Sequence, residues 1–239
     1  MTERKTLSLS QKETGYRYNR DSFLLADFFN PADIGSLLDL GAGVGVVSIL
    51  IGMENPHMKI TALEINADIA RIAAENARNS GLHHYHALAG DMMTAASLFC
   101  GVKFGAVVSN PPYRKKGSGR INPDPAKAAA RHELKMTMAG LVKASAMILA
   151  DGGSLSLTMI FERREEYLKE LASKGFYESR ARLVQSFENS EPILFLSEAR
   201  FGVRREFAME PPLVLKSETG GDSPEFNKII ERYGAGKIT

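Results

Sequence analysis

A short apolar run that stops at two consecutive prolines constrains this chain more than any other feature. Residues 104–109 predict a buried strand, and the sequence Asn-Pro-Pro-Tyr follows at 110–113. Pro111 and Pro112 have no N–H for a β-ladder, so the strand must end before them. Asn110 is therefore expected at the carboxyl end of a strand, the edge at which open α/β sheets bind ligands.

The same four residues offer what a planar amine needs. The side-chain oxygen of Asn110 and the backbone carbonyl of Pro111 can accept hydrogen bonds in the plane of an NH2 group. Tyr113 offers a flat face on which a base can stack. An ordinary strand that ends in a proline-rich loop would carry these residues too, so the rest of the chain must decide.

A glycine-rich turn between a strand and a helix marks a second candidate site. Residues 36–40 predict a buried strand, glycines follow at 41, 43 and 45, and residues 46–53 predict an apolar helix. Such a turn lets a ligand approach the backbone, and the new helix adds free N–H groups. The dinucleotide-binding pattern requires a glycine where Val46 stands. Asp39, just before the turn, can accept a hydrogen bond from a bound amine or water.

Predicted strands and helices alternate at short spacing over most of the chain. A second strand over 58–63 ends at Glu64, and a third over 84–89 is followed by Asp91. This alternation predicts an α/β fold with a doubly wound, mainly parallel sheet, in which Asp39, Glu64, Asp91 and Asn110 lie at successive strand ends. Later strands are expected over 153–160, 180–186 and 193–203. Helices are expected over 22–29 (capped by Asp21 and lying across a sheet edge), 68–80 (capped by Asn66, with Gly81 after it), 127–149, 162–173 and 226–233.

A basic, glycine-rich loop follows the Asn-Pro-Pro-Tyr sequence. Its cationic residues are Arg114, Lys115, Lys116 and Arg120. A loop of this composition can be solvated surface only, but its position beside the candidate site also suits a lid that binds nucleic-acid phosphates. Because the formal net charge is only +2, binding of RNA has to come from such local patches.

Composition bounds the remaining possibilities. The 239 residues are 44% hydrophobic, enough for one sizeable core, and the single cysteine excludes a disulfide framework and suits a cytoplasmic location. We find no signal-peptide core and no apolar run of the roughly 18 residues that a membrane span needs. Three histidines, at 83, 84 and 86, have no cysteine or second cluster beside them, so we expect a surface loop and no metal.

The combined motifs resemble those of the class I S-adenosylmethionine-dependent methyltransferases, which have a seven-stranded, Rossmann-like sheet. Residues 39–45 are similar to their methionine-binding loop, and residues 110–113 are similar to the motif of the branch that methylates amines. The stretches 16–28, 117–123 and 130–133 narrow the resemblance to the bacterial family that methylates N6 of the adenine beside the anticodon of a valine tRNA. The resemblance covers about residues 14–205, so we expect one methyltransferase domain over 1–208 and a C-terminal tail over 209–239, irregular over 209–224.

The resemblance also implies roles for individual residues. The adenine would be held by Asn110, Pro111, Pro112 and Tyr113, and RNA by the basic loop. S-adenosylmethionine would be bound by Asp39, Gly41, Ala42, Gly43, Gly45, Glu64, Ile65, Asp91, Met92 and Asn110.

Other functions are compatible with the same motifs. An rRNA methyltransferase acting on guanine N2 or adenine N6 could use the same active-site residues. A protein-glutamine methyltransferase shares the Asn-Pro-Pro-Tyr motif but carries a helical domain before the glycine turn, where this chain has only about 35 residues. A DNA adenine methyltransferase usually has an added target-recognition region, for which we find no segment. A non-catalytic RNA-binding protein would have no need to keep Asp39, Glu64, Asn110 and Tyr113. The sequence does not fix the oligomeric state.

Overall fold

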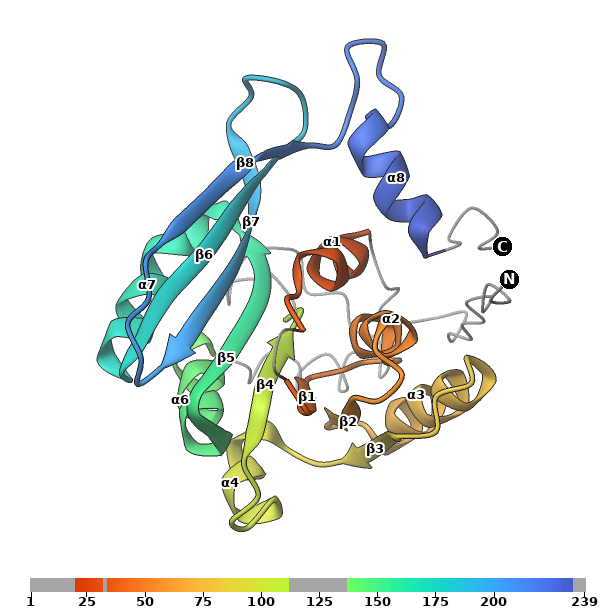
Figure 1. Cartoon of the computed structure of the whole chain (residues 1–239), viewed down its shortest axis with the longest axis vertical. Coiled ribbons are helices and arrows are strands. Elements are labelled where there is room, and N and C mark those ends of the chain that lie inside the picture. Colours follow the sequence, from red (N-terminus) through yellow and green to blue (C-terminus); the bar gives the residue numbers. More distant parts are fainter. Residues whose placement is uncertain (1–19, 32–33, 112–136, 234–239) are drawn as a thin grey trace, which may run out of the picture.

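A single sheet of eight strands forms the centre of the protein (Figure 1). The computed structural model describes residues 20–31, 34–111 and 137–233. The strand order is β3-β2-β1-β4-β5-β7-β6-β8, and β7 runs antiparallel to both of its neighbours while the other described strands share one direction. The strands are β1 Ser36–Leu40, β2 Lys59–Glu64, β3 Tyr85–Ala89, β4 Phe104–Ser109, β5 Leu149–Ile160, β6 Phe176–Gln185, β7 Pro192–Phe201 and β8 Ala208–Val214.

The sheet has one strand more than the seven that we expected. The additional strand, β8, lies at the edge and pairs in parallel with β6. Our expectation of an irregular segment over 209–224 was therefore wrong for its first part. Pro211 and Pro212 argued against a strand, but prolines are tolerated on an edge strand, where the missing N–H needs no partner. The carbonyl of Pro211 even accepts a hydrogen bond from Arg182 on β6.

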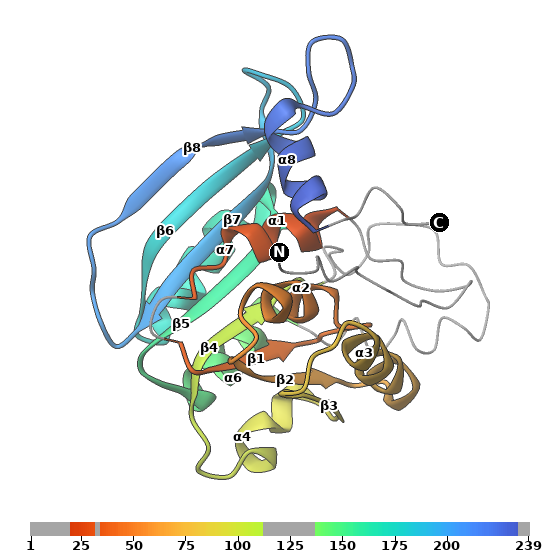
Figure 2. The same cartoon turned by 45° about the vertical axis from the view of Figure 1, so that its right-hand side comes forward.

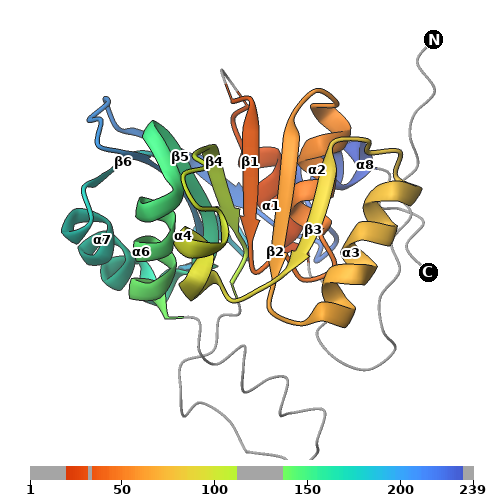
Figure 3. The same ribbon diagram turned by 90° about the horizontal axis from the view of Figure 1, so that it is seen from below.

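Helices cover both faces of the sheet (Figure 3). One apolar cluster lies between the sheet and the helices α1, α2 and α8, and a second lies between the sheet and α4, α6 and α7. Helix α3 packs on β2 and β3. The helices are α1 Asp21–Phe28, α2 Val46–Glu54, α3 Ala67–Asn79, α4 Ala95–Leu98, α6 Met138–Ile148, α7 Arg164–Ser173 and α8 Pro224–Arg232, with 3-10 turns at Met92–Thr94 and Phe161–Arg163.

The signals predicted for the ends of α3 were confirmed. The side chain of Asn66 accepts hydrogen bonds from the N–H groups of Asp68 and Ile69 and so caps α3, and Gly81 follows the helix with φ +72°. The helix expected over 127–149 begins only at Met138, where the Thr137 side chain caps it by accepting a hydrogen bond from the Gly140 N–H, so its predicted start was wrong. Residues 112–136 lie outside the described residues. No helix in the described ranges is both long and apolar enough to cross a membrane.

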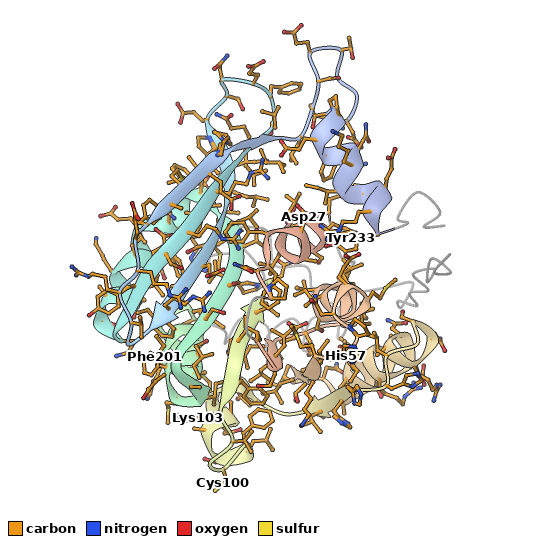
Figure 4. All side chains as sticks on the ribbon, in the orientation of Figure 1. Asp27, His57, Cys100, Lys103, Phe201 and Tyr233 are labelled. Atoms are coloured by element: carbon orange, nitrogen blue, oxygen red, sulfur yellow. The ribbon has the colours of Figure 1, made fainter. Side chains whose placement is uncertain are left out.

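The two ends of the described chain meet on one face of the sheet (Figure 2). Helix α1 was expected across a sheet edge, but it packs on the face against β5 and β7, between α2 and α8. Asp21 is its first residue and not its N-cap, which is Arg20. Figure 4 shows Asp27 of α1 near Tyr233 at the end of α8, and Arg232 donates a hydrogen bond to Asp27 at 3.0 Å. The C-terminal elements therefore hold α1 in place.

Candidate active site

Four neighbouring parallel strands bring the predicted polar residues to one edge of the sheet. In the order β3-β2-β1-β4, Asp91 lies two residues beyond β3, Glu64 ends β2, Asp39 is the second-last residue of β1, and Asn110 directly follows β4. The strands are paired in parallel, so their carboxyl ends coincide. The sequence prediction of one shared edge is confirmed.

The glycine turn is tied to β2 by Glu64. Gly41 and Gly43 have φ of +73° and +56°, values that L side chains rarely adopt. The Glu64 carboxylate accepts hydrogen bonds from the backbone N–H groups of Gly43 at 3.0 Å and Asn66 at 2.9 Å. A Cβ atom added to Gly43 would meet no atom of the described residues within 4 Å. None of the described residues therefore fills the space directly over Gly43, and the Glu64 oxygens keep lone pairs for further donors.

Gly45 is required both by its backbone and by a close neighbour. It is the N-cap of α2 with φ +87°. A Cβ atom at this position would lie 2.5 Å from the Tyr85 hydroxyl, so a side chain cannot be accommodated without movement of that ring. The glycine thus lets β3 and the start of α2 come together beneath the turn.

Asp39 lies in a buried polar cluster under the glycine turn. Its side chain is 1% exposed, and it accepts a hydrogen bond from the Ser48 hydroxyl at 2.6 Å. The same hydroxyl lies 3.1 Å from that of Tyr85. Burial raises the pKa of Asp39 to about 7, although hydrogen bonds from Ser48 lower it and the nearby Glu64 carboxylate raises it further. Burial and the Asp39 carboxylate also raise the pKa of Tyr85 above its ordinary value.

Asn110 is held by a serine from the first helix. Its side-chain NH2 group donates a hydrogen bond to the Ser22 hydroxyl at 3.1 Å, and Pro111 beside it is buried. At the end of β4, the Ser109 hydroxyl donates to the carbonyl of Leu40 on β1 at 2.8 Å. The start of the Asn-Pro segment is therefore anchored to the sheet through Ser109 and to α1 through Ser22.

Asp91 fixes the turn that follows β3. Its carboxylate accepts a hydrogen bond from the Met93 N–H at 2.8 Å and so caps the 3-10 turn Met92–Thr94. Met92 is buried, whereas Ile65 at the end of β2 is more than a third exposed. This corner offers an exposed apolar side chain beside carboxylates, which suits a ring with polar edges.

Some predicted site residues lie outside the described residues. They are Pro112, Tyr113, Arg114, Lys115, Lys116 and Arg120. Sequence reasoning missed the contacts of Ser22, Ser48 and Tyr85 with the site. Within the described ranges, no group of three or more histidine, cysteine, aspartate or glutamate side chains is arranged to hold a metal ion.

The fold and the site define a class of enzyme. A parallel sheet with one reversed strand, a glycine turn after β1, an acid at the end of β2 and an Asn-Pro sequence after β4 are the features of a class I methyltransferase. Residues 17–181 match the model of the methyltransferase small domain, and the chain belongs to this family. The resemblance predicted from the sequence is confirmed.

Individual relatives agree with this assignment. A tRNA1(Val) (adenine(37)-N6)-methyltransferase of Porphyromonas gingivalis is 27% identical over 96% of this chain and 92% of its own length. A release factor glutamine methyltransferase of Vibrio cholerae is 33% identical, but over only 42% of this chain and 37% of its own. The crystal structure of a predicted O-methyltransferase of Agrobacterium tumefaciens superposes with a TM-score of 0.68 at 20% identity, covering 89% of this chain and 96% of that one.

Proposed function

We propose that this protein transfers the methyl group of S-adenosylmethionine to the N6 amine of an adenine in RNA, namely the adenine beside the anticodon of a valine tRNA. The observation that carries the proposal is the position of Asn110, one strand away from the glycine turn and fixed at the end of β4. The name of the Porphyromonas gingivalis relative, which matches nearly the whole chain, supports the choice of substrate.

The strand ends fit S-adenosylmethionine. Open space lies over Gly43, and Glu64 beside it retains acceptor capacity for ribose hydroxyls. Asp39 lies under the turn, where it can stabilise an ammonium group directly or through water. We assign cofactor contacts to Asp39, Gly41, Ala42, Gly43, Gly45, Glu64, Ile65, Asp91, Met92 and Asn110. When bound, the cofactor supplies a methyl group activated by an adjacent sulfonium.

Asn110 and Pro111 carry the chemistry in this proposal. An exocyclic amine is a weak nucleophile because its lone pair is delocalised into the ring. The Asn110 side-chain oxygen and the Pro111 carbonyl hold the two amino hydrogens, so that the lone pair turns toward the methyl group. The new N–C bond would form as the S–C bond to the methyl group breaks, a neutral thioether would leave, and the methylated amine would release a proton to solvent. Positioning of the amine is expected to account for most of the acceleration, and no strong general base is needed.

The RNA-facing part of the proposal rests on sequence alone. Tyr113 would stack on the flipped adenine, since base–aromatic stacking contributes roughly 1–3 kcal/mol. The cationic residues Arg114, Lys115, Lys116 and Arg120 would contact nearby phosphates. If so, neutralising Lys115 and Lys116 reduces the salt dependence of RNA binding by about one to two phosphate contacts.

Mass spectrometry of nucleosides tests the proposal. Bulk RNA from a strain that lacks the gene is incubated with the protein and S-adenosylmethionine, then digested and analysed, with valine tRNA captured separately. We expect new N6-methyladenine in valine tRNA and none with Asn110→Ala. New N2-methylguanine, or methylation of rRNA only, would replace the proposed substrate by an rRNA site.

A protein substrate is the second candidate, favoured by the 33% identity to a release factor glutamine methyltransferase. The match covers less than half of this chain. The same labelled cofactor, supplied to purified release factors, tests this candidate. Methylated glutamine with unmodified RNA would favour it over the tRNA proposal.

A further inference from the structure

The contact between Ser22 and Asn110 joins two segments 88 positions apart in the sequence. Ser22 is 5% exposed and lies on α1, and its hydroxyl receives the hydrogen bond from the Asn110 side-chain NH2 group at 3.1 Å. Of the buried serine hydroxyls in the described residues, those of Ser48, Ser109 and Ser145 bond to Asp39 or to backbone carbonyls. Ser22 differs from these three serines because its hydroxyl contacts the side chain of Asn110, which carries the proposed chemistry.

Helix α1 is well fixed at this position. Phe23 and Leu25 are buried in the core, and the Phe23 ring lies 6.1 Å from that of Tyr233. The Arg180 guanidinium lies over the Phe28 ring and donates to the Phe28 carbonyl. Arg20 forms an ion pair with Asp222 at 2.9 Å. Because α1 is held by β6 and by elements beyond the matched family domain, the Ser22 hydroxyl has a defined place relative to β4.

A fixed partner matters because the two ends of an asparagine amide are nearly alike in shape but opposite in hydrogen bonding. The substrate amine needs the oxygen of Asn110, an acceptor. An amide rotated by half a turn would present its NH2 group to the substrate NH2, donor against donor. With its nitrogen engaged by Ser22, the amide directs its oxygen to the other side. Because a hydroxyl can both accept and donate, the contact fixes the position of the amide plane, and in the structure the nitrogen is the end that faces Ser22.

We propose that Ser22 is a positioning residue that holds the plane of the Asn110 amide in the place where its oxygen can accept from the substrate amine. The inference rests on the proposed function, in which Asn110 accepts a hydrogen bond from the substrate amine. Ser22 itself touches neither the methyl group nor the amine.

Kinetics of Ser22→Ala, with Ser22→Thr and Ser145→Ala beside it, provide the first test. Ser22→Ala is expected to lower kcat about tenfold, the effect of one lost hydrogen bond in positioning. The KM for S-adenosylmethionine and the thermal unfolding midpoint should stay near wild type, and Ser22→Thr should restore most of kcat. Ser145→Ala removes a buried helical hydroxyl that bonds to the Leu141 carbonyl, so it controls for packing. A folded Ser22→Ala protein with wild-type kcat would overturn the proposal.

A second measurement needs no substrate. The side-chain NH2 signals of Asn110 are assigned in a nitrogen-15 spectrum by their loss in Asn110→Ala. In Ser22→Ala these signals should shift, and their protons should exchange faster with water. Unchanged signals would refute the positioning role, whatever the kinetics. If the wild-type protein binds the cofactor but methylates no RNA, the proposed function fails by itself, and the spectrum still decides whether Ser22 orients Asn110.

Discussion

The two halves of the sheet differ in the partners of their buried and partly buried carboxylates. In the half formed by β5, β6, β7 and β8, Glu178 pairs with Arg164 at 2.8 Å, and Glu198 pairs with both Arg180 and Arg200. In the half formed by β1, β2, β3 and β4, Asp39 and Glu64 are 1% and 9% exposed, and neither forms an ion pair with the described residues. They accept hydrogen bonds from a hydroxyl and from backbone N–H groups.

This difference separates a structural role from a binding role. A buried carboxylate is costly unless it is paired or hydrogen-bonded. In the half formed by β5 to β8, ion pairs with arginines offset the cost of burying the carboxylates. In the other half, the negative charge is available to a ligand, and the proposed cofactor brings an ammonium group and ribose hydroxyls. An unpaired buried acid whose pKa is raised by burial, as that of Asp39 is, is typical of functional sites.

The largest effect on stability is expected from Glu198→Ala. Glu198 is 4% exposed, and its removal leaves Arg200 without its partner on the sheet, while Arg180 keeps Glu210. Breaking a buried pair from one side costs about 3 kcal/mol. Urea unfolding should show this loss, and calorimetry should show unchanged affinity for S-adenosylmethionine per folded molecule. Weakened cofactor binding would contradict the division between the two halves.

Asn110→Ala tests the other side of the comparison. It should lower turnover about 100-fold, because a misplaced reacting group costs that much. Cofactor affinity should fall far less than turnover, since Asn110 is one of ten residues assigned to the cofactor whereas its contact with the substrate amine carries the chemistry. Single-turnover methylation and cofactor titration measure the two quantities separately. Wild-type turnover in this variant would remove Asn110 from the proposed chemistry.

Glu64→Ala is the counterpart of Glu198→Ala, the same truncation in the other half of the sheet. Affinity for S-adenosylmethionine should fall by roughly 1.5–3 kcal/mol, the contribution of a charged hydrogen-bond acceptor. Stability should change less than in Glu198→Ala, because Gly43, whose N–H loses its acceptor, is a partly exposed residue near water. Calorimetry on both variants makes the comparison. Unchanged affinity in Glu64→Ala would place the cofactor elsewhere.

Local patterns predicted the site half of the sheet better than the other half. The strands over 36–40, 58–63, 84–89 and 104–109 were predicted within one residue, because glycine, proline or polar residues bound each apolar run. The edge strand β8 was missed because its exposed side chains and two prolines give no strand pattern. Its pairing with β6 is a tertiary effect that overrides local propensity.

Contacts between distant segments were beyond the reach of the sequence. The apolar pattern of 22–29 predicted a packed helix, but not that Ser22 would face Asn110. Similarly, nothing local shows that Tyr85 on β3 would lie beside Ser48, 37 positions earlier. The roles of the motif residues could be predicted because each motif is a short local sequence. The residues that position the motif side chains, such as Ser22, depend on how the helices pack.

The smallest expected effect concerns pH. Burial raises the pKa of Asp39 from 3.8 to about 7, so between these values the folded protein binds more protons than the unfolded chain. Stability of the free protein should therefore fall as pH rises through this window and level off above it. An ammonium group on the cofactor favours the carboxylate, so cofactor affinity should change in the opposite direction. It should weaken about tenfold from about pH 8 to about pH 6.

The variant Asp39→Asn shows how much of the pH dependence comes from titration of the Asp39 carboxylate. The amide keeps the size of the side chain but cannot ionise, so the pH dependence of cofactor affinity should become nearly flat over this range. Any titration of the cofactor's own amine remains in both proteins and can be subtracted. Calorimetry at several pH values gives the affinities, and thermal unfolding of the free proteins gives the stability slopes. Parallel pH profiles for wild type and Asp39→Asn would mean that Asp39, like Glu198, is a structural carboxylate.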